Sequence, residues 1–203
     1  MKDKILVWDW PTRVFHWLLV ACFVGSWITS GSDRYLLIHV SCGYTIFALM
    51  VFRLLWGLAG SRHARFASFL RGPGAAVGYV RSLVRGPAAH FTGHNPAGGW
   101  AIALMVVLGL VTPIFGWITY NEWTGDWAAE THETLAWAFL ILVGLHLLGV
   151  IVGSVAHREN LAAAMLSGFK RGDATEAIPR AYGWLALVML IGVGLLWWWS
   201  MSV

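Results

Sequence analysis

Two histidines stand at the ends of a stretch of sequence that is otherwise almost entirely apolar. The stretch reads THETLAWAFLILVGLH, and it places His132 and His146 fourteen residues apart. In a helix that separation is about 3.9 turns or ~21 Å, so both imidazoles project from nearly the same face at two depths. An imidazole within hydrocarbon requires a partner or a function. The chemistry available here therefore depends on what else lies at those two depths.

The composition indicates an integral membrane protein, whose helices must position these histidines. Of the 203 residues, 58% are hydrophobic, 12% are charged and fourteen are tryptophan. Apolar runs long enough to cross about 30 Å of hydrocarbon, roughly 20 residues each, predict five transmembrane helices. Their approximate ranges are 11–29, 35–59, 97–120, 131–156 and 181–200. We therefore predict an all-α integral membrane fold, with residues 1–203 in a single membrane domain.

The basic residues predict the orientation, because cytoplasmic loops retain Lys and Arg. Thirteen of the fourteen basic residues are expected on one side of the membrane. They lie near the start of the first helix, at the end of the second helix and in the loop 60–96, or in the loop 157–180. They are Lys2, Lys4, Arg13, Arg53, Arg62, Arg65, Arg71, Arg81, Arg85, Arg158, Lys170, Arg171 and Arg180. Only Arg34 falls on the opposite side, where residues 121–130 carry acidic side chains alone. The N terminus is thus expected inside and the C terminus outside. The net charge of +4 is a topology signal and indicates no nucleic-acid partner.

Two shorter segments refine this arrangement. The first apolar run is interpreted as a retained helix and not a secretory signal, because of its length and because no convincing small-x-small cleavage site follows Ile28. Asp9 and Pro11 fit the start of that helix, and Asn95 and Pro96 fit the N-cap and first helical residue of the third one. Residues 73–85, PGAAVGYVRSLVR, place valines and a leucine on one side and predict an interfacial helix, and residues 159–169 are a second candidate.

This topology predicts two pairs of histidines. His39 opens the second helix on the outer side, level with His132 at the start of the fourth. His16 lies near the inner end of the first helix and is the intramembrane histidine available to His146. The expected pairs are therefore His39 with His132 and His16 with His146.

Facing histidines can form a hydrogen-bonded pair, a metal site or the two axial ligands of a haem. Zinc normally recruits further Cys, Asp or Glu ligands, and none lies at the depth of His146. A haem needs two ligands, room for the macrocycle and cations for its propionates. Gly43, one turn below His39, could provide that room. Arg53 lies near the depth of His146, where it either binds a propionate or extends to the inner interface, and Arg13 has the same two options.

The remaining Cys, His and acidic residues bear on the type of haem and on the roles of the loops. Cys22 and Cys42 are expected to be packing residues, and neither lies in a C-x-x-C-H sequence, so any haem would be b-type and non-covalent. The histidines of the inner loops are expected to be solvated, with a role in proton delivery as the alternative; these are His63, His90, His94 and His157. The outer acids are expected to be solvated too, although a negative rim could attract a basic electron carrier.

Five stretches of the chain share their motifs and order with a known family. They are VWDWPTRVFHW at 7–17, LIHVSCGY through FRLLWGLAGSRHARFASF at 37–69, GHNPAGGW at 93–100, HETLAWAFLILVGLHLLGV at 132–150 and HRENLAAAMLSG at 157–168. Over residues 5 to about 171 the chain resembles the bacterial cytochrome b561 and nickel-iron hydrogenase b-type cytochrome family.

The resemblance implies a four-helix bundle in the bacterial cytoplasmic membrane that holds two haem b groups, to which the fifth helix is an addition. It implies that His16, His39, His132 and His146 are the axial ligands. It also implies outer-sphere electron exchange between membrane quinone and a redox partner such as a hydrogenase, a reductase or cytochrome c. The N terminus would be cytoplasmic and the C terminus periplasmic, with Trp197, Trp198 and Trp199 in an interfacial belt.

Two other functional classes stay open from the sequence. One is a stand-alone quinone-coupled oxidoreductase, such as a superoxide oxidase. The other is a haem-free transporter or proton pathway that uses the membrane histidines. An electron-transfer component is expected in preference to a stand-alone catalyst, because two imidazoles on each iron leave no open site for substrate.

Overall fold

Five long helices form the body of the protein. The computed structural model describes residues 3–86 and 89–202, so Lys2 of the topology argument lies outside the described residues. The long helices are α1 (Trp10–Thr29), α2 (Leu36–Ala59), α5 (Pro96–Tyr120), α6 (Trp127–His157) and α8 (Gly183–Ser200). Each is long and apolar enough to cross a membrane, which confirms the predicted fold class. The fourth expected run, 131–156, begins four residues earlier in the structure, at Trp127.

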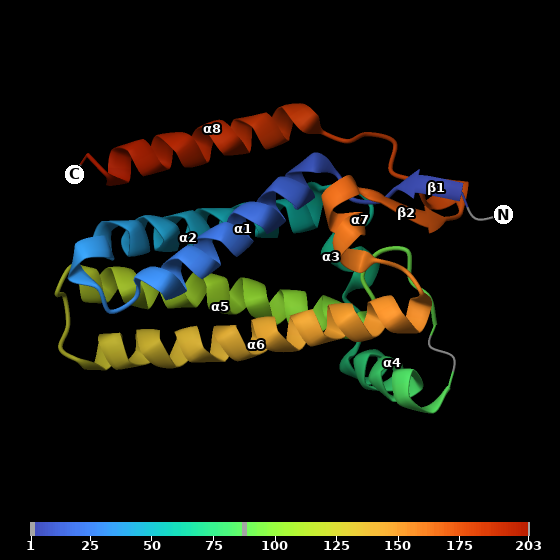
Figure 1. Cartoon of the computed structure of the whole chain (residues 1–203), viewed down its shortest axis with the longest axis horizontal. Helices are drawn as coiled ribbons and strands as arrows, with labels where there is room; N and C mark the ends of the chain where they lie inside the picture. Colours follow the sequence, from blue (N-terminus) through green and yellow to red (C-terminus); the bar gives the residue numbers. More distant parts are fainter. Residues whose placement is uncertain (1–2, 87–88, 203) are drawn as a thin grey trace.

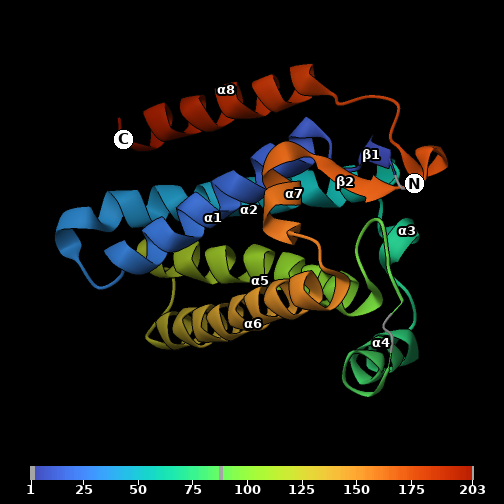
Figure 2. The same ribbon diagram turned by 45° about the vertical axis from the view of Figure 1, so that its right-hand side comes forward.

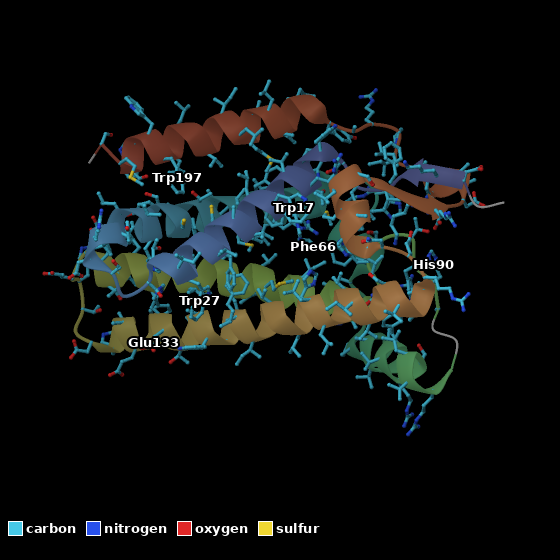
Figure 3. The ribbon with its side chains drawn as sticks, viewed as in Figure 1. Trp17, Trp27, Phe66, His90, Glu133 and Trp197 are labelled. Atoms are coloured by element: carbon cyan, nitrogen blue, oxygen red, sulfur yellow. The ribbon has the colours of Figure 1, made fainter. Side chains whose placement is uncertain are left out.

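The helices follow one another antiparallel, and α8 lies against α1 and α2 on the side of the bundle away from α6 (Figures 1 and 2). Two hydrogen bonds fix its last turns to α2. Trp197 Nε1 donates to Thr45 Oγ1 at 2.9 Å, and the hydroxyls of Ser41 and Ser200 are 2.8 Å apart. Figure 3 shows Trp197 near the C-terminal end of α8. The core of the bundle is therefore made by the first four long helices, with α8 added to one side.

The short elements gather at one end of the long helices, which is called the inner end below (Figure 1). They are β1 (Asp3–Leu6), α3 (Phe66–Phe69), α4 (Pro73–Arg85), α7 (Leu161–Ser167), β2 (Phe169–Gly172) and the 3₁₀ turn η2 (Ala174–Glu176). A further 3₁₀ turn, η1 (Asp33–Tyr35), precedes α2 at the other end. The inner end thus holds the N-terminal strand and the two basic loops, as the charge pattern predicts.

A two-stranded antiparallel sheet joins the N terminus to the last loop. β1 pairs with β2, with Leu6 opposite Phe169 and Asp3 opposite Gly172. Gly168, with φ of +85°, ends α7 and turns the chain into β2, a backbone conformation that favours glycine. Its carbonyl accepts from the N–H groups of Val7 and Trp8 at 2.9 and 3.0 Å. Sequence analysis did not predict this sheet, because four-residue strands carry too short an alternating pattern.

Two long helices begin with the caps that the sequence predicts. The buried carboxylate of Asp9 accepts from Thr12 N–H at 2.7 Å at the start of α1. Asn95 accepts from Gly98 N–H at 2.8 Å at the start of α5. Each cap satisfies an N–H group that has no partner within the first helical turn. The N termini of α1 and α5 are therefore fixed at the inner end.

The apolar core lies midway along the bundle. Its buried residues come from α1, α2, α5 and α6, and they are Phe15, Cys22, Cys42, Ile46, Leu49, Met50, Val106 and Phe139. Both cysteines are reduced and buried, as expected of packing residues. Phe139 is seven residues from His132 and seven from His146, so the core separates the two depths at which the histidines lie.

The predicted amphipathic helix 73–85 is present as α4. It points nearly along the line of sight in Figure 2 while the long helices run across the view. Its apolar side chains Val77, Val80 and Val84 are 70, 51 and 83% exposed, so none of the described residues covers this face. The second candidate, 159–169, contains the short helix α7.

Candidate functional site

The structure brings His39 and His132 together between α2 and α6. Their ring centres are 6.1 Å apart. The Nδ1 atom of His39 lies 2.9 Å from the carbonyl oxygen of Ser26, and that of His132 lies 2.9 Å from the carbonyl oxygen of Thr112. Because a carbonyl only accepts, each Nδ1 carries the hydrogen, and Nε2 of each neutral ring keeps its lone pair for a ligand. The outer pair is therefore oriented in the way that metal-binding histidines usually are.

Gly116 makes room for the ring of His132. A Cβ atom at Gly116 would lie 2.8 Å from His132 Cε1 and 3.0 Å from Nδ1. Gly116 stands one turn after Thr112 on α5, so the same helix face supplies both the carbonyl acceptor and the space. Sequence analysis missed this glycine, because its role depends on how closely α5 and α6 approach.

His16 on α1 and His146 on α6 are the histidines predicted as the inner pair, and both are half-buried in the bundle. Among the described residues, His16 Nδ1 is buried and has no hydrogen-bond partner, in contrast with Nδ1 of His39 and His132. The ring of His16 also contacts Trp17 on the same helix, with ring centres 5.0 Å apart. The inner pair thus lacks the backbone acceptors that orient the outer pair.

Arg53 is buried near the inner end of α2, against α3, and its side chain does not extend to the protein surface. Its side chain is only 4% exposed, and its guanidinium lies over the rings of Phe66 and Phe69 at 4.8 and 5.8 Å. Figure 3 shows Phe66 near the inner end of the bundle. Among the described residues, Arg53 Nη1 has no hydrogen-bond partner. A buried cation with an unused donor is suited to bind an anionic group.

Asp9, at the start of α1, is a second charged group at the inner end. Its side chain is fully buried and also accepts from Trp56 Nε1 at 3.1 Å. Sequence analysis interpreted Asp9 as a helix start alone, and that role is confirmed. The contact with Trp56 adds a tie between α1 and α2 that the sequence pattern does not reveal.

His94 also belongs to this inner group, although sequence analysis expected it to be solvated. Its ring lies between those of Trp8 and Phe69, with centres 4.6 and 4.9 Å away. Burial holds the pKa of His94 well below its ordinary value, and the positive charge of Arg53 lowers it further. His94 is therefore a neutral polar group close to Arg53 at physiological pH. A signal for this was its place in the GHNP motif, directly before the cap of α5.

The other loop histidines differ from one another. The expectation that His63 is solvated is wrong: it is 7% exposed, and its Nε2 lies 2.8 Å from the carbonyl oxygen of Glu176. Burial lowers its pKa as well. His90, shown at the inner end in Figure 3, is exposed and lies 3.5 Å from Glu159. His157 lies 3.2 Å from the hydroxyl of Tyr79.

Gly43 and Arg13 have different surroundings. A Cβ atom at Gly43 would meet no heavy atom of the described residues within 4 Å, so the space beside it, one turn below His39, is open. Arg13 stacks on Trp10 at 4.0 Å and donates from Nη2 to the carbonyl of Leu166. It therefore faces α7.

The chain was compared with known proteins. The family model described as prokaryotic cytochrome b561 matches residues 7–168. The chain belongs to the prokaryotic cytochrome b561 family. Curated relatives include probable Ni/Fe-hydrogenase B-type cytochrome subunits. That of Rhizobium leguminosarum bv. viciae is 24% identical, over 82% of this chain and 89% of its own. That of Bradyrhizobium diazoefficiens is 20% identical, over 82% and 86%. That of Escherichia coli K12 is 24% identical, over 81% and 89%. No solved structure gives a significant match.

Membership makes this cytochrome b561 relative a multi-pass membrane cytochrome b of electron transfer, and a b-type cytochrome implies haem b. The outer pair fits such a group. Two imidazole nitrogens each about 2 Å from a shared metal, with ring centres about 1 Å further out, separate those centres by about 6 Å. The observed separation is 6.1 Å. The described residues contain no group of three or more His, Cys, Asp or Glu side chains that could hold a metal ion.

Proposed function

We propose that this chain is a di-haem cytochrome b subunit that carries electrons between the membrane quinone pool and a hydrogenase. The observation that carries the proposal is the outer pair, whose 6.1 Å spacing and paired Nδ1 acceptors suit two axial ligands. The names of the relatives favour a hydrogenase over a reductase or cytochrome c as the redox partner. We also propose that residues 1–203 form a single membrane domain.

His39 and His132 would hold the outer haem, and His16 and His146 the inner one, without covalent attachment. A haem held by two histidines would supply one-electron transfer chemistry, with both imidazoles occupied in holding the group. The carbonyls of Ser26 and Thr112 hold the outer imidazoles in one tautomer. Gly43 would leave room for the macrocycle.

Arg53 would bind a propionate of the inner haem. Its burial and its partnerless Nη1 among the described residues support this role over a snorkelling one. The apolar shell around Arg53 excludes water and so strengthens the attraction to an anion. His94 would add a neutral donor or acceptor at the same place.

The orientation follows from the basic loops, which share the inner end with the N terminus (Figure 1). We propose the bacterial cytoplasmic membrane, with the N terminus in the cytoplasm and the C terminus in the periplasm. The two haem levels would then lie toward opposite faces of the membrane.

The experiment is a pyridine haemochrome assay on the purified chain, followed by purification from the native membrane. We expect two haem b per chain and a co-purifying hydrogenase, with hydrogen gas reducing both haems in the complex. One haem per chain would refute the di-haem arrangement. Reduction of the isolated chain by superoxide, with no hydrogenase bound in the membrane, would favour the stand-alone oxidase instead.

A further inference from the structure

The helix α4 presents a face that is apolar along its centre and cationic along one edge. Val77, Val80 and Val84 are exposed, and at about 100° per residue they lie within about 60° of one another. Arg81 and Arg85 are exposed too, and they follow about 40° and 80° beyond Val77. This is the pattern of a helix that lies in a membrane interface, with apolar side chains toward the acyl chains and cations at the headgroups.

Two hydrogen bonds hold α4 at the level where transmembrane helices begin and end. Trp100 Nε1, early in α5, donates to the carbonyl oxygen of Arg71 at 2.8 Å, just before α4 begins. Tyr79 of α4 is buried, and its hydroxyl lies 3.2 Å from Nε2 of His157, the last residue of α6. Tyr79 lies about 120° around α4 from the centre of the valine face. The anchored side of α4 therefore faces the bundle, and the valines face away from it.

The direction of α4 is that of a surface helix. It points nearly along the line of sight in Figure 2, whereas the membrane-spanning helices run across that view. Because those helices cross the membrane, α4 runs along the membrane surface and not through it. Its 13 residues are also too few to span the bilayer, since they cover about 20 Å of the roughly 30 Å of hydrocarbon.

The arginines of this loop have no acidic residue near them in the sequence. Residues 60–96 contain five arginines and neither Asp nor Glu. Within the part of the chain that the structure describes, the ion pairs join Glu159 to His90 and to Lys170, so Arg81 and Arg85 have no carboxylate partner. Their charge is therefore available to an anionic group from outside the chain.

A phospholipid with a net negative headgroup satisfies both parts of this face. A guanidinium binds phosphate oxygens through two N–H groups, and each arginine close to an anionic membrane surface strengthens binding roughly fivefold. An acidic protein would pair with the arginines as well. It would not provide acyl chains for three valines held at the membrane boundary, so the combined face favours lipid.

We propose that α4 lies in the membrane interface at the inner end and binds anionic phospholipid, with its valines among the acyl chains and Arg81 and Arg85 on the headgroup phosphates. The inference uses the membrane-spanning fold and the charge of the loop, and it does not depend on haem, quinone or hydrogenase. Because Tyr79 ties α4 to the end of α6, the bound lipid fixes the loop 60–96 to the membrane surface.

The test measures how far the valine face is covered by lipid in the whole protein. Val80→Cys places a thiol on the face, and Ala174→Cys places one at an exposed position of η2 at the same end as the control. The native Cys22 and Cys42 are buried. Each variant is reconstituted into nanodiscs of phosphatidylcholine alone or with 30% phosphatidylglycerol, and the rate of labelling by a polyethylene-glycol maleimide is measured.

We expect the thiol of Val80→Cys to be labelled at least tenfold more slowly with phosphatidylglycerol than without it, while Ala174→Cys changes less than twofold. Adding Arg81→Gln and Arg85→Gln to Val80→Cys should bring the two rates to within twofold of each other. Adding Arg171→Gln and Arg180→Gln, which removes the same charge from exposed positions of the other basic loop, should leave the difference in place.

Three results would overturn the proposal. Equally fast labelling of Val80→Cys in both lipids would show a face that anionic lipid does not cover and that is free for a protein partner. Protection in detergent that rises with protein concentration would show that a second copy of this chain covers it. An equal loss of protection in both arginine pairs would assign the effect to the overall charge of the inner end and not to α4.

Discussion

Replacing His39 by Ala should remove one haem and leave the other in place. The change deletes one member of the outer pair, whose rings are 6.1 Å apart, so an iron there would keep only His132. His16 and His146 lie at the other depth, about 21 Å away by the rise of α6. The buried core around Phe139 separates the two levels. The loss should therefore stay confined to the outer level.

The expected size of the haem loss follows from the proposed two haems per chain. Haem content should fall from two per chain to one, the α-band absorbance per protein should fall by about half, and a redox titration should show one transition in place of two. His146→Ala should give the same total loss from the inner level, with the other transition remaining. His90→Ala is the control, since His90 is exposed on an inner loop and belongs to neither pair.

Size-exclusion chromatography establishes that each variant remains folded. If His39→Ala empties both levels in a folded protein, or removes the same transition as His146→Ala, the two-pair reasoning is refuted. The double variant His39→Ala and His132→Ala gives an internal check. It should lose no more haem than either single variant, because both residues serve one level.

Three further predictions concern the surroundings of these pairs. Gly116→Ala should weaken outer haem binding by about 1–3 kcal/mol through overpacking against His132, measured by haem transfer to an acceptor protein, while Gly144→Ala, where a Cβ meets open space, should not. Asp9→Ala should lower stability by about 2–4 kcal/mol in thermal unfolding, because a cap and a buried indole partner are both lost. The lowered pKa of His94 means that the unfolded chain takes up a proton that the folded one does not. Stability should therefore fall as the pH drops below about 6.5, and His94→Gln should reduce that slope in melts at several pH values.

Much of the architecture could be predicted from local pattern. The five apolar runs, the caps at Asp9 and Asn95, and the amphipathic segment 73–85 are all present as expected. Each of these features depends on side chains that are a few residues apart, so the interactions that decide it lie within one segment of the sequence. The short sheet between β1 and β2 was missed, because it joins residues more than 160 positions apart through backbone groups that any sequence possesses.

The candidate site likewise has features that the sequence predicts and features that only the packing of the helices decides. The sequence by itself determined which residue types reach which depth, because helical rise is constant and the run from His132 to His146 is unbroken. It could not determine what surrounds them. That Gly116 faces the His132 ring, that Arg53 is buried beneath Phe66, and that His94 is enclosed by aromatic rings are results of how neighbouring helices and loops pack.

A groove along α1 beside Trp17, walled on its other sides by Leu166 of α7 and Leu190 of α8, illustrates the limit most clearly. The sequence determined an apolar stripe on the first helix, with tryptophans and one arginine at helical spacing. Only the tertiary structure decided that α7 and α8 stand far enough from that stripe to leave a cavity and do not close over it. The physical reason is that periodicity fixes which side chains share a face, whereas the distance to the opposing surface depends on long-range contacts that no local pattern encodes.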